Sequence, residues 1–392
     1  MIGADECPRP AAAGCEKVDG PQEGVNRRRA APCTPGMALA VLLLGGCLAA
    51  PRPVPLTDLP EPERPTPAAA PAAPVEAWRT DVGNGLEYGI TVRGPVILAT
   101  TTDRMLVAHA AEDGRRFWGR RYGSPLVGAP VPVGAHVYFG TGYRDRKIHA
   151  VELELGRAGW ERRTGEARTP VTVGPHDLYV GMEDGRVLAL PLEDGSVRWE
   201  RRLPGKAVWA PMHYGDQVLV ATYHDTLYTM DAASGQVRGR LPLPGTPSAP
   251  PLLAADTLYV PLHPGVLAAV VLSGAQPALA WRATLTDPVL AAPVRASGGG
   301  LLLLDRSARL WTVDAAGTAR RLAELGGAAT GSLAAAAQGA VVGRLDGALF
   351  LVGADGVVRW RLELGDAIVS PATVRTDGLY IPLLHGEVVK FR

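Results

Sequence analysis

The chain has 392 residues, 47% of them hydrophobic, and its 40 basic and 39 acidic residues leave a formal net charge of +1. A nucleic-acid-binding protein is excluded by this balance, because contacts to phosphates require an excess or a stripe of Lys and Arg. With 47 Gly and 35 Pro, about a fifth of the chain, the composition favours many short strands and turns over long helices.

The first part of the chain has the features of an export leader. Arg27–Arg29 precede an apolar run from Met37 to Leu44. A basic stretch followed by a short apolar segment is typical of a secretory signal peptide, and about ten apolar residues are too few to span a bilayer. We expect residues 25–46 to be a signal peptide, and residues 1–24, which are polar and acidic, to be untranslated or disordered.

A cysteine follows this leader directly. The segment Leu44-Gly45-Gly46-Cys47 resembles the lipobox of bacterial lipoproteins, whose cysteine is lipidated and becomes the first mature residue. The alternative is an ordinary signal peptide cut near Ala50, which would discard Cys47. All four cysteines lie within the first 47 residues, so the remainder holds no disulfide framework and no C-x-x-C spacing. We therefore expect lipidation at Cys47 and a location in the cell envelope.

A proline-rich segment comes next. Residues 48–77 contain nine prolines among Ala, Glu and Thr. Such a segment is extended, at about 3.1 Å per residue where it adopts polyproline II. The sequence therefore predicts a tether over residues 47–75 between Cys47 and a folded domain at 76–392.

From Trp78 onward the chain repeats with a period near 40 residues. The residues that end the second strand of each unit step by 39 to 43 and are Ala99, Gly140, Gly181, Ala221, Pro261, Leu304, Gly343 and Pro382. An outer position that holds six of the eight tryptophans steps by 39 to 42, and its residues are Trp78, Trp118, Trp160, Trp199, Gly239, Trp281, Arg321 and Trp360. Both landmarks occur eight times, and we expect the tryptophans of the outer position to pack between neighbouring units.

This period is typical of four-stranded propeller blades. The chain enters the repeat at Glu76–Thr80, which matches the last strand of a unit, and it ends at Gly386–Arg392, which matches the third strand. The first strand should therefore complete the last unit and remove two exposed sheet edges. The sequence predicts an all-β fold, an eight-bladed β-propeller whose N-terminal strand closes the last blade.

The unit resembles the pyrroloquinoline-quinone-like (PQQ-like) propeller repeat. Val137–Thr141 and Leu178–Met182 match its Tyr-Val-Gly strand, and Thr226–Gly235 matches its third strand and the turn that follows. A lipobox, a proline-rich tether and a single eight-bladed propeller together resemble the BamB family of outer-membrane assembly lipoproteins. The resemblance implies a non-catalytic scaffold that binds proteins of the β-barrel assembly machinery.

Quinoprotein dehydrogenases share this repeat and form the enzyme branch of the resemblance. They typically hold their quinone against a vicinal Cys-Cys disulfide, which a mature chain with Cys47 alone cannot form. The sequence also lacks the Gly-x-Ser-x-Gly and His-Glu-x-x-His motifs. We therefore expect no enzyme activity and no cofactor, with a PQQ-binding or PQQ-dependent oxidoreductase-like protein and a small-ligand or glycan-binding propeller as the alternatives.

Candidate binding residues lie in turns that share one face of the predicted disc. Tyr and Arg are favoured anchors of protein interfaces. The candidates are Tyr143, Arg144, Arg146, Trp209, Tyr223, His224, His263 and His385. The three histidines lie in different blades, too far apart to place ligands within about 2.1 Å of one zinc ion, so we expect no metal site. The predicted partners are envelope proteins and, through the lipid, a membrane, and we expect a monomer.

Overall fold

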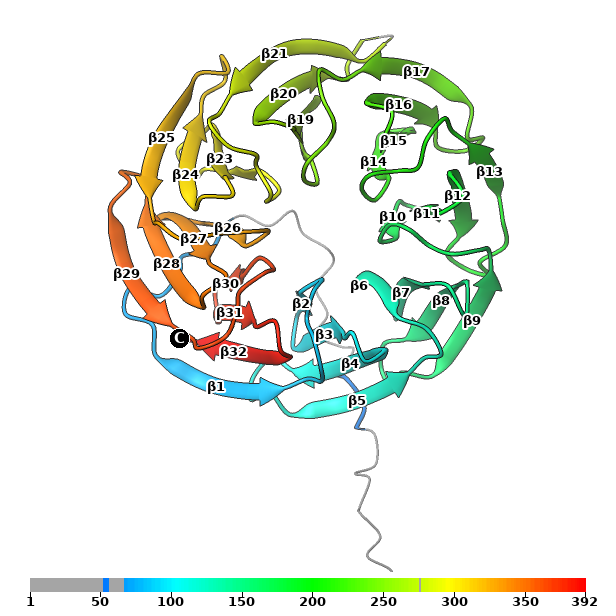
Figure 1. Ribbon diagram of the computed structural model, residues 1–392. Coiled ribbons are helices and arrows are strands. Elements are labelled where there is room, and N and C mark those ends of the chain that lie inside the picture. The colour runs from blue at the N-terminus through cyan, green and yellow to red at the C-terminus, as the bar shows by residue number, and fades with distance from the viewer. Residues whose placement is uncertain (1–51, 56–66, 275) are drawn as a thin grey trace, which may run out of the picture. The chain divides into compact units, whose positions relative to one another are not determined.

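The structure, a computed structural model, describes residues 52–55, 67–274 and 276–392. The chain divides into two compact units, Met1–Ala49 and Ala50–Arg392, and every described residue belongs to the second. The described residues form 32 strands in eight four-stranded antiparallel sheets, which stand around a ring in Figure 1. The predicted all-β, eight-bladed propeller is confirmed. The predicted signal peptide and Cys47 lie outside the described residues.

Each blade contains four strands, which we letter A to D from the centre of the ring outward (Figure 1). The A strands are β2 (Ile90–Arg93), β6 (Leu126–Val133), β10 (Thr172–Val173), β14 (Met212–Tyr214), β18 (Leu252–Ala254), β22 (Val294–Arg295), β26 (Leu333–Ala336) and β30 (Thr373–Arg375). The B strands are β3 (Val96–Thr100), β7 (His136–Thr141), β11 (Asp177–Gly181), β15 (Gln217–Thr222), β19 (Thr257–Leu262), β23 (Leu301–Leu304), β27 (Gly339–Gly343) and β31 (Gly378–Pro382).

The two outer strands of each blade follow in chain order, except in blade 8, whose D strand comes from the start of the propeller. The C strands are β4 (Met105–Ala110), β8 (Lys147–Glu152), β12 (Arg186–Pro191), β16 (Thr226–Asp231), β20 (Val266–Val271), β24 (Arg309–Val313), β28 (Ala348–Gly353) and β32 (Glu387–Phe391). The D strands are β5 (Arg116–Arg121), β9 (Ala158–Arg163), β13 (Trp199–Arg202), β17 (Val237–Pro242), β21 (Ala278–Thr284), β25 (Ala319–Glu324), β29 (Val358–Glu363) and β1 (Glu76–Asp81).

The B and C strands form the core because both of their faces are apolar. All six residues of β28 and all five of β31 are buried. Leu349 and Leu351 of blade 7 pack in one cluster with Leu379 and Ile381 of blade 8. Each such side chain contributes about 1.5–3 kcal/mol when it leaves water, and a lone blade could not bury it. Stacking of neighbouring blades therefore holds the ring together.

The outer tryptophans join each blade to the next. Trp118 Nε1 donates to the carbonyl of Leu153, in the turn between the C and D strands of blade 2, over 2.9 Å. Trp78, Trp160 and Trp199 make the equivalent bond to the next blade over 2.8 Å. A glycine of that turn packs against the indole: at Gly195, with φ +62°, a Cβ would lie 2.3 Å from the Trp160 indole. The predicted packing of these tryptophans between blades is confirmed.

The ring closes at blade 8, where another stretch of the chain takes the place of the turn between the C and D strands. In blade 2, the C–D turn begins at Leu153, and the backbone N of Glu152, just before it, bonds to the carbonyl of Arg157 at its end. In blade 8 the chain ends at Arg392, whose N bonds to Val75 O over 3.0 Å, while Val75 N bonds back to Arg392 O over 2.9 Å. Trp360 Nε1 donates to Pro71 O over 2.8 Å, as its counterparts do to a turn carbonyl. Residues 71–74 therefore occupy the place of the turn between the C and D strands of blade 8.

A buried lysine lies beside this closure. Lys390 of β32 is 1% exposed, and its Nζ donates to Ala111 O of blade 1 over 2.8 Å. The same ammonium lies 3.4 Å from Asp377 Oδ2 and 4.8 Å from the ring centroid of Tyr380. Burial, reinforced by the hydrogen bond to Asp377, raises the pKa of the Tyr380 phenol. Blade 8 is thus joined to blade 1 by polar contacts as well as apolar packing.

Antiparallel pairing places the turns on two opposite faces. The BC face carries the turns between B and C strands and the connections from each D strand to the next A strand. It consists of residues 82–89, 101–104, 122–125, 142–146, 164–171, 182–185, 203–211, 223–225, 243–251, 263–265, 285–293, 305–308, 325–332, 344–347, 364–372 and 383–386. The AB face carries the A–B and C–D turns, residues 94–95, 111–115, 134–135, 153–157, 174–176, 192–198, 215–216, 232–236, 255–256, 272–274, 276–277, 296–300, 314–318, 337–338, 354–357 and 376–377.

Candidate protein-binding face

A rigid turn presents three of the predicted residues. Tyr143, Arg144 and Arg146 lie between β7 and β8, and Tyr143 is 54% exposed. The hydroxyl of Ser124, which is fully buried, accepts from the backbone N of Arg144 over 2.9 Å and from that of Asp145 over 2.8 Å. Arg144 Cζ lies 5.7 Å from the Tyr143 ring centroid, and Arg146 Nε donates to Tyr143 O over 2.9 Å. These bonds fix the turn, so little conformational entropy would be lost when a partner binds.

A second cluster joins blades 3 and 4. Tyr223, 48% exposed, lies in the turn between β15 and β16. Arg168 Nη2 donates to the Tyr223 hydroxyl over 2.9 Å, and the guanidinium carbon lies 5.0 Å from the tyrosine ring centroid. Arg168 Nη1 donates to Glu183 Oε2 over 2.8 Å, and Lys206 also forms an ion pair with Glu183. We name these four residues the Tyr223 cluster.

The charges of this cluster hold one another in place. The hydrogen bonds from Lys206 and then Arg168 lower the pKa of Glu183. A carboxylate that stays ionised keeps both cations near the tyrosine, where the guanidinium also gains a cation–π contact. The Tyr223 ring is therefore presented to solvent in a fixed orientation.

The sequence did not identify Arg168, Glu183 or Lys206 as candidates. Arg168 and Lys206 lie in D-to-A connections, and Glu183 lies in the turn between β11 and β12. One rule nevertheless places all four residues on the same face, because B–C turns and D-to-A connections share that face. The Arg and Lys residues in the D-to-A connections were the signal that could have revealed the cluster.

The predicted histidines are spread around the same face. His224 and His263 are exposed, in the B–C turns of blades 4 and 5. His385, in blade 8, is 82% exposed, and its Nδ1 lies 2.5 Å from Asp366 Oδ1. Burial of Asp366 opposes its ionisation, yet the hydrogen bonds from His385 lower its pKa. In the part of the chain that the structure describes, no three His, Cys, Asp or Glu residues gather to hold a metal ion.

The position of Trp209 differs from the prediction. Its backbone lies in the connection that leads into blade 4, but its side chain is only 5% exposed. The indole packs in an apolar cluster with Leu219 of blade 4 and Leu258 and Leu262 of blade 5. Trp209 therefore fills space between two blades and offers no surface to a partner.

Exposed aromatic residues concentrate on the BC face. Among the described residues, the large hydrophobic side chains with the greatest exposure include three aromatic ones, Tyr88, Tyr143 and Tyr223, and all three lie on this face. The exposed aliphatic residues lie mostly in C–D turns and D strands, as Val197 and Val237 do. Tyr and Arg are enriched among residues that dominate binding energy, whereas Val is under-represented. The BC face is therefore the better candidate for a protein interface.

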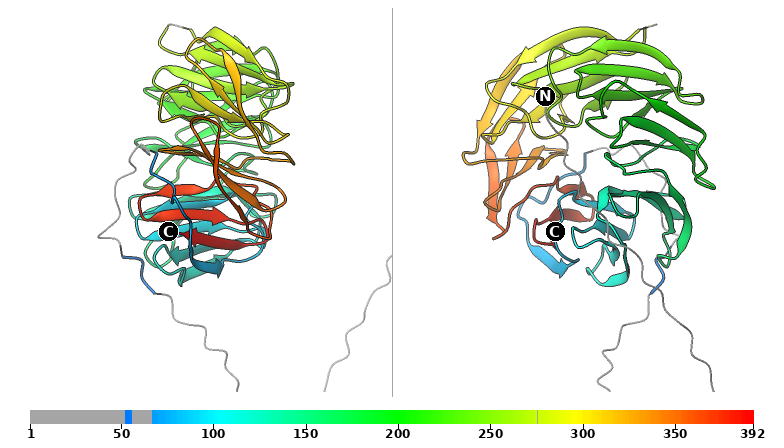
Figure 2. Two further views of the ribbon diagram at one scale, coloured as in Figure 1. Left: turned by 90° about the vertical axis from the view of Figure 1, so that its left-hand side faces the viewer. Right: turned by 45° about the vertical axis from the view of Figure 1, so that its right-hand side comes forward.

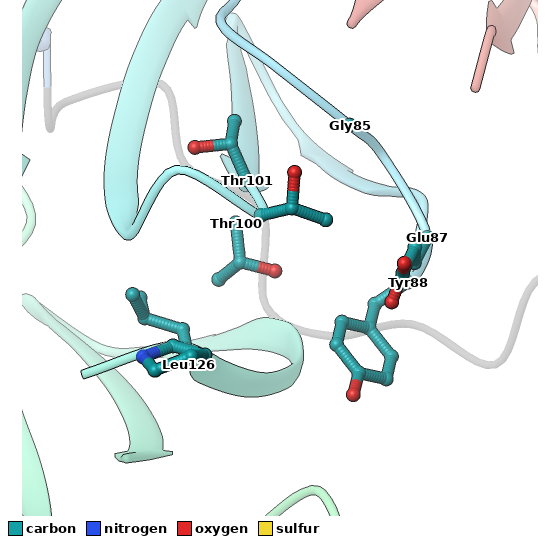
Figure 3. A pocket seen from close by; sticks show the side chains of 8 residues that line it. Gly85, Glu87, Tyr88, Thr100, Thr101 and Leu126 are labelled. Atoms are coloured by element: carbon teal, nitrogen blue, oxygen red, sulfur yellow. The ribbon is translucent and has the colours of Figure 1, made fainter. Parts of the chain in front are cut away.

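A cavity of about 240 Å³ opens on the same face, between blade 1, the connection that leads into it, and the start of blade 2 (Figure 3). Its lining includes Tyr88, Leu126 and three threonines in a row. The hydroxyl of Thr100 donates to Gly128 O over 2.8 Å, that of Thr102 donates to Asn84 O over 2.9 Å, and that of Thr101 bonds to Asp103. Because these hydroxyl hydrogens are already used, the cavity offers a small molecule few free donors.

The comparisons with known proteins agree with this architecture. A protein-family model described as outer membrane protein assembly factor BamB matches residues 69–181 and 144–295, together more than half of the chain. The chain belongs to this family. The BamB family is associated with the cell envelope, and membership supports a scaffold role at the level of the family.

Solved structures show the same fold at low sequence identity. The crystal structure of BamB from Moraxella catarrhalis is 14% identical with a TM-score of 0.68, over 82% of this chain and 100% of that chain. A computationally designed protein, Ika8, is 12% identical with a TM-score of 0.68, over 79% of this chain and 96% of that chain. Among the curated proteins, none matches this chain. At such identities the likeness to solved structures concerns the fold alone.

Proposed function

We propose that this chain is a non-catalytic scaffold of the cell envelope, anchored through a lipid on Cys47, that binds a protein of outer-membrane β-barrel assembly with its BC face. The single observation that carries the proposal is the Tyr223 cluster, an exposed tyrosine held by an arginine and a network of charges. The rigid turn at Tyr143 supplies a second anchor on a nearby blade. Membership of the BamB family supports the class of partner.

The lipid anchor is supported by sequence, since the lipobox ends at Cys47 and a proline-rich segment follows. Within the described residues, no helix is long and apolar enough to cross a membrane. The non-catalytic role is supported by the cysteines, because none follows Cys47 and a vicinal disulfide cannot form beyond it. Saturable binding of PQQ to the purified chain would contradict this part of the proposal.

Loss of the Tyr223 side chain is expected to weaken partner binding. Truncation of a central tyrosine anchor typically costs about 2 kcal/mol or more, so Tyr223→Ala should raise Kd about thirtyfold or more. Arg168→Ala should do the same, because the tyrosine then loses its hydrogen bond and its charged neighbour. The measurement is the affinity of the purified chain for a reconstituted β-barrel assembly complex.

Val237→Ala is the matched control. Val237 is 45% exposed, close to the 48% of Tyr223, but it begins β17 at the outer edge of blade 4. Its replacement should leave the affinity unchanged. Equal weakening by Tyr223→Ala and Val237→Ala, or no weakening by either of the BC-face variants, would contradict a binding role for this face.

A further inference from the structure

Two stretches of the proline-rich segment contact the blades. Residues 52–55 lie across the rim between blades 1 and 2, where Arg52 N donates to Phe117 O over 3.0 Å and Val54 N donates to Glu154 O over 2.9 Å. Val54 is 1% exposed and packs in one cluster with Trp118 and Leu153. A single aliphatic side chain thus enters the groove that the outer tryptophan of blade 1 forms with the next turn.

The second stretch, residues 67–75, lies against blade 7 before it enters β1. Ala68 O accepts from Ala337 N over 2.9 Å. The side chain of Gln338 makes a reciprocal pair with the backbone of Ala70: Nε2 donates to Ala70 O over 2.6 Å, and Oε1 accepts from Ala70 N over 3.0 Å. Ala70 is 4% exposed.

Both stretches meet the AB face. Glu154 lies in the C–D turn of blade 2, and Ala337 and Gln338 form the A–B turn of blade 7. In the edge-on view of Figure 2, the blue stretches of chain lie on one side of the disc. Both stretches thus lie on the face opposite to the Tyr223 cluster.

These contacts shorten the reach of the lipid anchor. If the chain were free from Cys47 to Val75, its 28 steps could span about 90 Å. Because residue 52 is already bonded to blade 1, only five steps remain, and they span at most about 18 Å. Chain length therefore keeps a lipid on Cys47 within about 18 Å of Arg52, which is bonded at the rim of blades 1 and 2.

We propose that residues 52–55 and 67–75 form a strap that places the AB face of blades 1 and 2 against a lipid bilayer and turns the BC face away from it. The proposal rests on the lipid anchor at Cys47. The membrane surface is the occupant of this part of the AB face, and the Tyr223 cluster remains free for a protein in the space beyond the membrane.

Fluorescence quenching from the bilayer tests the orientation. The full chain, isolated from the membrane of a bacterial host, is reconstituted into vesicles of phosphatidylethanolamine and phosphatidylglycerol that contain a lipid with a nitroxide headgroup. A fluorescent residue is placed at Glu112, in the C–D turn of blade 1, or at Tyr143, on the BC face. Quenching should be severalfold stronger at Glu112, and equal quenching at the two sites would overturn the strap.

Val54→Asp should release residues 52–55, because a carboxylate cannot enter that apolar groove without a partner. Quenching at Glu112 should then fall to the level at Tyr143. Pro55→Ser is the matched control, since Pro55 is exposed in the same stretch, and it should leave the quenching unchanged. Should Val54→Asp fail to fold, a Gly-Ser sequence of equal length in place of residues 52–55 makes the same test. Unchanged quenching at Glu112 in the released variant would overturn the strap.

The anchor itself is tested separately with Cys47→Ala. This variant should no longer float with the vesicles. If it floats as well as the native chain does, the lipid anchor is wrong, and the strap's orientation falls with it. If only the native chain floats but both sites are quenched equally, the anchor stands and the strap alone is overturned.

Discussion

A chain that starts at Val82 should fail to form a stable propeller. It lacks β1, and with it the pairing of five positions to β32 and the Trp78 bond to blade 1. The edge of β32 would be left open, and the residues that replace the turn of blade 8 would also be missing. The expected loss is comparable with the whole free energy of unfolding of a typical domain, about 5–15 kcal/mol. Thermal unfolding followed by circular dichroism measures it.

A circular permutant provides the control. Arg392 and Val75 already exchange both backbone hydrogen bonds, and Pro71 occupies the place of the first turn residue. If residues 71–81 are joined directly after Arg392 in a chain that starts at Val82, blade 8 gains an ordinary C–D turn. The permutant should then unfold within a few degrees of the native chain. Failure of the permutant to recover stability would mean that closure by β1 is not what stabilises the ring.

The free energy of unfolding should fall as the pH decreases from about 6.5 to 4. His149 is 6% exposed and stacks on Phe139 at 5.0 Å, and burial lowers its pKa from 6.5 to about 4. Glu161, 3.7 Å away, favours the charged form but is outweighed. His109, 2% exposed, also has a lowered pKa because of burial. Over this pH range, both histidines therefore remain neutral in the folded chain, whereas in the unfolded chain they already bind protons.

The sign follows from the difference in bound protons. Between the two pKa values the unfolded state binds more protons, so stability is full above pH 6.5 and is lost as the pH falls toward 4. For His149 alone the loss approaches about 3 kcal/mol at 1.36 kcal/mol per pKa unit. Urea unfolding at a series of pH values measures it.

His149→Phe should remove most of this slope, since a phenyl ring keeps the stacking on Phe139 and binds no proton. His263→Phe is the control, because His263 is exposed in a turn. The free energy of unfolding of this variant should vary with pH as that of the native chain does. An unchanged slope in His149→Phe would show that another group accounts for the acid sensitivity.

The blade count could be predicted because each landmark follows a local rule. Five of the six tryptophans of the outer position have a glycine of the next turn against the indole, as Trp160 has Gly195, so these tryptophans recur with the period of the blade. The phase of the two chain ends then indicated how the ring closes. The partner of Trp360 could not be predicted, because Pro71 lies 289 residues away in a segment without the repeat.

The candidate site was predicted only in part. The residues of the B–C turns were assigned to one face because strand order alone decides it. The contact of Tyr223 with Arg168 spans 55 residues and two blades, and it depends on side-chain packing that no spacing shows. Trp209 was misplaced for the same reason: the sequence showed a tryptophan in a connection, but not the space between blades 4 and 5 that it fills.

Photo-crosslinking in cells tests the central claim, that the BC face binds a protein of β-barrel assembly. A photoreactive residue is placed at Tyr143 or Tyr223 on the BC face, and at Val197 or Val357 on the AB face, all of them more than 40% exposed. The claim predicts crosslinks to a β-barrel assembly protein from Tyr143 and Tyr223 and none from the two valines. Crosslinks to that protein from Val197 and Val357 alone, or from no position, would contradict it.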